Sequence, residues 1–104
     1  MNFVFPPPVT ASVAVAGEPA RFPVRRIFCV GRNYAAHARE MGKDPEREAP
    51  FFFTKPADAI VGDGETVAYP PLTSNFHFEG ELVVAIGKAG SDIANDDALA
   101  HVYG

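Results

Sequence analysis

Short apolar runs, separated by glycine, proline and charged residues, alternate along this chain, and each run has the length of a strand. Val24–Val30 ends in four apolar residues, and Phe51–Phe53 is entirely aromatic, which is typical of buried strands and of core rather than of a substrate pocket. Thr10–Ala16 and Thr66–Tyr69 mix small or polar residues with β-branched and aromatic ones and predict two further short strands.

The run from Phe76 to Ile86 is the most informative, because Glu79 and Glu81 lead directly into apolar, mainly β-branched residues. Strand side chains alternate between faces, so both carboxylates point the same way, with Cα atoms roughly 6.5 Å apart. Like charges held this close are costly unless a proton or cation relieves them, and a hard divalent cation prefers oxygen ligands. The spacing therefore suggests a metal site, and the alternative is a solvent-facing strand edge with both carboxylates hydrated.

Helical patterns occur twice. Tyr34–Met41 is rich in alanine, with Asn33 as the expected N-terminal cap and Gly42 just past the end. Asp96–Val102 predicts a second helix, for which Asn95 is the expected cap. With strands outnumbering helices, the pattern predicts a β-rich α+β fold.

Turn and loop signals divide these elements. Residues 1–20 predict an extended lead-in, since the proline triplet Pro6–Pro8 favours polyproline II. The remainder, residues 21–104, is expected to belong to a single domain. Gly17-Glu18-Pro19 and Asp63-Gly64 are turn signals.

Composition narrows the class of protein. A hydrophobic content of 47% and a charged content of 21% over 104 residues are ordinary for one globular domain or part of one. The net charge of −4 argues against a nucleic-acid or anionic-membrane surface. One cysteine, Cys29, cannot form an internal disulfide, which fits a reducing cytoplasm, and its apolar neighbours favour a buried structural thiol. No signal peptide or membrane-spanning run is evident.

A second group of residues could perform chemistry. His37 and Glu40 lie three apart on the predicted helix and share a face. A carboxylate beside an imidazole raises its basicity, which suits a general base that activates water. A plain surface pair is the alternative.

Three further residues are candidates for supporting roles. His77 precedes Glu79 by two residues and could support a bound ion from the same strand face. Arg32 and Lys55 each lie near a predicted strand end, where a cation could hold a substrate carboxylate. The alternatives are an ordinary polar residue at the strand entry and two surface charges.

Three ordered motifs resemble one known family. They are CVGRNYAAH at 29–37, FTKP at 53–56 and EGELVVAIGK at 79–88. Together they resemble the N-terminal part of the fumarylacetoacetate hydrolase family. The lead-in FVFPPP and the segment PFFFTKPADA are most similar to the bacterial fumarylpyruvate hydrolases of gentisate catabolism.

The resemblance implies a specific chemistry. Glu79 and Glu81 match the two carboxylates that bind a divalent ion, usually magnesium, manganese or calcium, of which magnesium is expected here. His37 and Glu40 match a base dyad that acts on water. The ion binds the 1,3-diketo acid and stabilises the enolate released when a carbon–carbon bond is hydrolysed. The implied fold is a mixed β-sandwich roll, and the implied assembly is a homodimer.

The chain also departs from this family. Members run to roughly twice its length, and their third acidic ligand, an aspartate, and a lysine would fall beyond Gly104. The expectation is therefore an N-terminal fragment, inactive alone, of a hydrolase of fumarylpyruvate or a related acylpyruvate. Alternatives are related oxaloacetate decarboxylases, hydroxymuconate isomerases and sugar-acid dehydratases, or a non-catalytic remnant that only mediates dimerisation.

Overall fold

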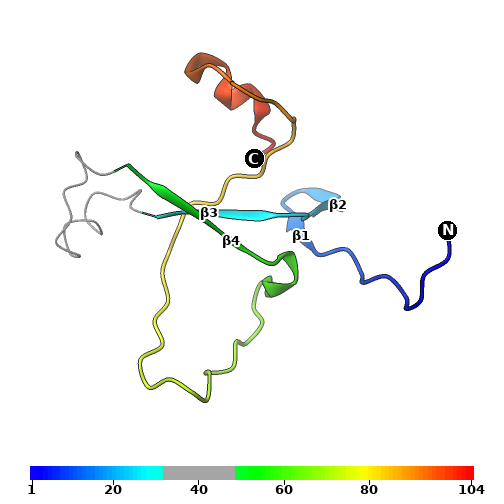
Figure 1. Cartoon of the computed structure of the whole chain (residues 1–104), viewed down its shortest axis with the longest axis vertical. Helices are drawn as coiled ribbons and strands as arrows, with labels where there is room; N and C mark the ends of the chain where they lie inside the picture. Colours follow the sequence, from blue (N-terminus) through cyan, green and yellow to red (C-terminus); the bar gives the residue numbers. More distant parts are fainter. Residues whose placement is uncertain (32–48) are drawn as a thin grey trace. The chain divides into compact units, whose positions relative to one another are not determined.

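The computed structural model describes residues 1–31 and 49–104. It divides into two units, Met1–Val67 and Ala68–Gly104. Strands and short 3₁₀ helices follow one another along the described chain (Figure 1), in the order β1 (Ser12–Val15), β2 (Glu18–Pro23), β3 (Ile27–Gly31), β4 (Phe51–Lys55), η1 (Ala57–Ala59) and η2 (Asn95–His101). The prediction that strands predominate is confirmed for this part of the chain.

β1 and β2 form an antiparallel hairpin, closed at Gly17, whose φ of +74° favours glycine. The guanidinium of Arg21 on β2 donates from Nε to Ser12 Oγ at 2.8 Å and from a terminal nitrogen to the Ser12 carbonyl at 3.0 Å. The strand predicted over Thr10–Ala16 is confirmed. The expected turn is wrong at its far end, because Glu18 and Pro19 already belong to β2, whose mixed sequence becomes a strand through its pairing with β1.

β3 and β4 pair antiparallel without a shift in register, from Ile27 opposite Lys55 to Gly31 opposite Phe51. The strands predicted at both places are confirmed, although β3 begins at Ile27 rather than at Val24 and β4 extends through Lys55. A Cβ at Gly31 would overlap the Phe51 ring, so glycine allows the aromatic side chain to lie across the backbone of β3. Phe51 and Phe53 stack on one face of the strand, with ring centroids 6.0 Å apart.

The prediction that these strands are buried is wrong for the described residues, none of which is buried. Phe52 is 68% exposed and Phe28 62% exposed, and Cys29 is half-buried. The physical reason is that two strands form a single thin layer, so their faces stay open until a further layer packs against them.

The strands predicted over Phe76–Ile86 and Thr66–Tyr69 are not formed in the described chain. Among the described residues, Ile86 alone of the former run makes a β-bridge, which joins it antiparallel to Val102. A strand needs a ladder of such pairings to a partner, and a single bridge is not a ladder.

The second predicted helix exists as η2, but it is a 3₁₀ helix, and Asn95 is its first residue rather than its cap. Ala94 occupies the cap position without a side-chain hydrogen bond. Seven residues are too few for a stable α-helix in the absence of packing, which favours the tighter turn. The turn at Asp63-Gly64 is confirmed, with φ of +77° at Gly64.

The helix predicted over Tyr34–Met41, with Asn33 and Gly42 at its ends, lies outside the described residues. Within the described ranges, no helix has the length and apolar character that crossing a membrane requires.

Candidate functional site

Glu79 and Glu81 lie in the second unit, on a segment exposed to solvent. In residues 1–31 and 49–104, no group of three histidine, cysteine, aspartate or glutamate side chains is arranged to hold a metal ion. The oxygen donors suit a hard divalent cation, whereas two carboxylates leave much of its coordination shell to other ligands. These two residues therefore fit as part of a metal site.

The loop before the glutamates is held by two hydrogen bonds and one ring contact. The backbone N–H of Phe76 donates to Tyr69 Oη at 3.1 Å, and the two rings meet edge to face, with centroids 5.5 Å apart. The backbone N–H of Asn75 donates to Thr73 Oγ1 at 3.1 Å. This network fixes the direction in which the chain enters the Glu79 segment.

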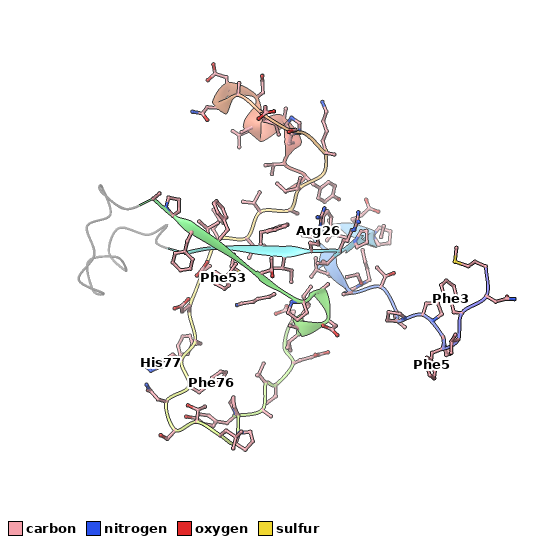
Figure 2. All side chains as sticks on the ribbon, viewed as in Figure 1. Phe3, Phe5, Arg26, Phe53, Phe76 and His77 are labelled. Atoms are coloured by element: carbon pink, nitrogen blue, oxygen red, sulfur yellow. The ribbon has the colours of Figure 1, made fainter. Side chains whose placement is uncertain are left out.

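His77 lies beside Phe76 on the same loop (Figure 2). Its Nε2 lies 2.6 Å from Asn75 Oδ1. Because an amide oxygen only accepts, the ring donates to it from Nε2. His77 is thus oriented by Asn75, and its support of a bound ion stays a prediction.

The segment after the glutamates is held by backbone pairing. The carbonyl of Ala85 accepts from the N–H of Tyr103 at 2.8 Å and of Gly104 at 3.5 Å, and the Ala85 N–H donates to the Gly104 carbonyl at 2.7 Å. Two residues of one segment therefore face one residue of the other, which is a β-bulge. It lies four residues beyond Glu81.

Lys55, the end of β4, lies in the first unit beside an open hollow of about 440 Å³. Arg25 and Arg26 line the same hollow, together with Thr54. An open, cationic hollow of this kind suits a carboxylate ligand, and the substrate-binding role of Lys55 stays a prediction.

Arg25 and Arg26 were not predicted as site residues. The sequence shows only that they directly precede β3, whereas the pairing of its first residue, Ile27, with Lys55 is what brings them to the hollow. The Arg26 guanidinium also lies 5.8 Å from the centre of the Phe28 ring, within the range of a cation–π contact. Only the antiparallel pairing of β3 with β4 shows that Arg25, Arg26 and Lys55 line the same hollow.

Arg32, His37 and Glu40 lie outside the described residues. Their roles as a carboxylate-binding cation and a base dyad stay predictions.

Comparison with known proteins places these residues in context. The family model described as fumarylacetoacetate (FAA) hydrolase C-terminal matches residues 26–104. The chain belongs to the fumarylacetoacetate hydrolase family. This match includes the Glu79–Glu81 pair, Lys55 and the segment that holds His37 and Glu40.

Two curated relatives illustrate the range of activities in the family. A fumarylpyruvate hydrolase of a Ralstonia species is 51% identical over 61 residues, which are 59% of this chain and 32% of the relative. Oxaloacetate tautomerase YisK of Bacillus subtilis is 43% identical over 84 residues, which are 79% of this chain and 28% of that protein. The chain thus spans about a third or less of either curated relative.

A solved structure shows the fold. The crystal structure of fumarylpyruvate hydrolase from Pseudomonas aeruginosa, in complex with Mn²⁺ and pyruvate, is 58% identical and superposes with a TM-score of 0.92. The superposition covers 99% of this chain and 46% of the solved one. The strand-rich chain therefore forms part of the fumarylacetoacetate hydrolase-type fold.

Proposed function

We propose that the protein carrying this chain is a divalent-metal-dependent hydrolase that cleaves a carbon–carbon bond of fumarylpyruvate or a related acylpyruvate. The observation that supports this most is the close match, at 58% identity, to a fumarylpyruvate hydrolase whose crystal structure holds Mn²⁺ and pyruvate. Pyruvate is the product expected when water cleaves an acylpyruvate. Such an activity belongs to the hydrolases that act on ketonic substrates.

Each predicted residue has a role in this proposal. Glu79 and Glu81 would hold the divalent ion, Mg²⁺ or Mn²⁺, with His77 in support. When bound, the ion supplies Lewis-acid stabilisation of the charge that develops on the keto-acid oxygens. Lys55 and Arg32 would hold a substrate carboxylate.

His37, oriented by Glu40, would act on water. The imidazole accepts a proton as the water oxygen bonds to the acyl carbonyl carbon. The bond from that carbon to the neighbouring methylene then breaks, and its electron pair leaves with the pyruvate half as an enolate. Protonation of the enolate carbon gives pyruvate, and the acyl half leaves as a carboxylic acid.

The decisive experiment is an assay of the complete gene product. We expect the diketo-acid absorbance of fumarylpyruvate to fall with time, a chelator to stop the reaction, and added Mg²⁺ or Mn²⁺ to restore it. Turnover that persists after exhaustive chelation would rule out the metal assignment.

A second candidate is a tautomerase of oxaloacetate, favoured by the 43% identity to the Bacillus subtilis protein over most of this chain. Both activities act on a 2-keto acid, but tautomerisation moves a proton without breaking a carbon–carbon bond. Product analysis by NMR separates them: fumarate and pyruvate from fumarylpyruvate support hydrolysis, whereas enol–keto exchange of oxaloacetate without cleavage of fumarylpyruvate supports tautomerisation.

Lys55 allows a test of carboxylate binding. We expect Lys55→Met to raise KM for fumarylpyruvate about tenfold, with a smaller effect on kcat, because a charge-assisted hydrogen bond to the substrate is lost. Lys55→Arg keeps the positive charge and should hold KM within about threefold. Unchanged KM in Lys55→Met would show that another group binds the carboxylate.

The proposal extends to the assembly and the location of the complete protein. We propose a homodimer in the cytoplasm in which residues 21–104 form the N-terminal portion of the catalytic domain, after a lead-in of residues 1–20. Light scattering of the complete gene product tests the dimer, and a monomer at micromolar concentration would contradict it.

A further inference from the structure

His101, the last residue of η2, is half-buried and has contacts on two sides. Its Nδ1 lies 3.0 Å from the carbonyl oxygen of Lys88. Because a carbonyl only accepts, Nδ1 carries a proton and donates. Its own carbonyl accepts from the N–H of Gly87 at 2.8 Å and of Lys88 at 3.2 Å. The backbone carbonyl of His101 thus holds Gly87 and Lys88, and its side chain holds Lys88 a second time.

The ring occupies a defined place. A Cβ at Gly90 would lie 2.7 Å from His101 Cε1 and 2.7 Å from Ile93 Cδ1, so the missing side chain of Gly90 leaves room for the imidazole. Asp92, between Gly90 and η2, has φ of 51°, a left-handed conformation that turns the chain towards the helix. The imidazole therefore fills the turn between the Glu81 segment and η2.

The residues after His101 form the bulge against Ala85. The order of contacts is continuous: His101 meets Gly87 and Lys88, Val102 bridges Ile86, and Tyr103 and Gly104 both face Ala85. Residues 79–84 directly precede Ala85 in the chain. The pairing of residues 85–88 with residues 101–104 therefore sets the point and the direction from which the Glu79–Glu81 segment extends.

We propose that His101 is a positioning residue for the Glu79–Glu81 site. Its Nδ1–H···O bond to Lys88 holds the register of residues 85–88 against 101–104, and through it the orientation of the two carboxylates upstream. This role rests on the proposed function in so far as the carboxylates bind a divalent ion. The hydrogen-bonded register itself is independent of that function.

The test compares His101→Ala with His101→Asn in the complete gene product. The asparagine amide can donate to the Lys88 carbonyl in place of Nδ1, whereas alanine cannot. Asp96→Asn, an exposed change on the same helix, is the matched control. Two measurements are made: hydrogen exchange of the Ala85, Gly87 and Tyr103 amides in the metal-free protein, and Mn²⁺ affinity by electron paramagnetic resonance.

We expect these amides to exchange about fivefold faster in His101→Ala, and Mn²⁺ to bind about fivefold more weakly, because one hydrogen bond between neutral groups is lost. His101→Asn and the control should stay within twofold of the wild type. Unchanged exchange or unchanged Mn²⁺ affinity in His101→Ala overturns the proposal, and so does an asparagine variant as defective as the alanine one. A wild-type protein that binds no Mn²⁺ would instead refute the proposed function, and the exchange rates would still decide whether His101 holds the register.

Discussion

Replacing Glu81 by glutamine in the complete gene product should lower kcat by about a thousandfold and abolish Mn²⁺ binding in the micromolar range. In the proposed site the carboxylate is one of the two oxygen ligands, Glu79 and Glu81, and glutamine keeps its size but removes its charge. Stabilisation of developing charge by a bound metal amounts to several kcal/mol, and about 1.4 kcal/mol corresponds to a factor of ten in rate. Steady-state kinetics and a Mn²⁺ titration measure the two effects.

The matched control is Asp63→Asn, which removes a carboxylate from an exposed turn in the first unit. Asparagine is compatible with a turn, so this variant should have wild-type kinetics. Wild-type activity in Glu81→Gln would disprove the assignment of Glu81 as a ligand. An equal loss in both variants would attribute the effect to net charge rather than to coordination.

Replacing His37 by alanine should lower kcat about a hundredfold to ten-thousandfold, the usual contribution of a positioned general base. Mn²⁺ affinity should remain within about twofold of the wild type, because the role proposed for the imidazole is to act on water and not to bind the ion. Steady-state kinetics and the same Mn²⁺ titration measure these quantities. The two measurements together distinguish the role of His37 from that of Glu81. Replacement of Glu81 should remove both activity and metal binding, whereas replacement of His37 should remove activity alone.

Glu40→Gln provides the matching variant for the dyad. Glutamine can still accept a hydrogen bond from the imidazole but does not raise its basicity, so we expect a loss of activity smaller than that of His37→Ala. If His37→Ala retains full hydrolysis of fumarylpyruvate, the base is a different residue, and the dyad assignment is wrong.

The sequence predicted the strands whose apolar residues are contiguous. Ile27–Val30 and Phe51–Phe53 became β3 and β4, since β-branched and aromatic side chains favour extended backbone locally. It did not predict β2, whose sequence EPARFP has no strand pattern and depends on hydrogen bonds to β1. The sequence also predicted a strand over Phe76–Ile86 that is not formed, because a strong local preference for extended backbone is not enough to make a paired strand.

The candidate site could likewise be predicted from the sequence only in part. The Glu79–Glu81 spacing and the motifs around His37 and Lys55 were sufficient to recognise the family to which the chain belongs. The contribution of Arg25 and Arg26 to the hollow beside Lys55 was not visible, because it depends on the antiparallel register of β3 and β4. His101 had no recognisable context for the same reason, since its partner Lys88 is thirteen residues away in the sequence.

By itself, the sequence determined the chemical character of the site residues, the positions of β1, β3 and β4, the turn at Gly64 and the family. Only the tertiary structure decided that β2 pairs with β1, that the run through Glu79 and Glu81 forms no strand in the part of the chain that the structure describes, and that His101 holds Gly87 and Lys88. The physical reason is that backbone preference and side-chain chemistry are local properties. Hydrogen-bond partners and register depend on residues distant in the sequence, which only the folded chain brings together.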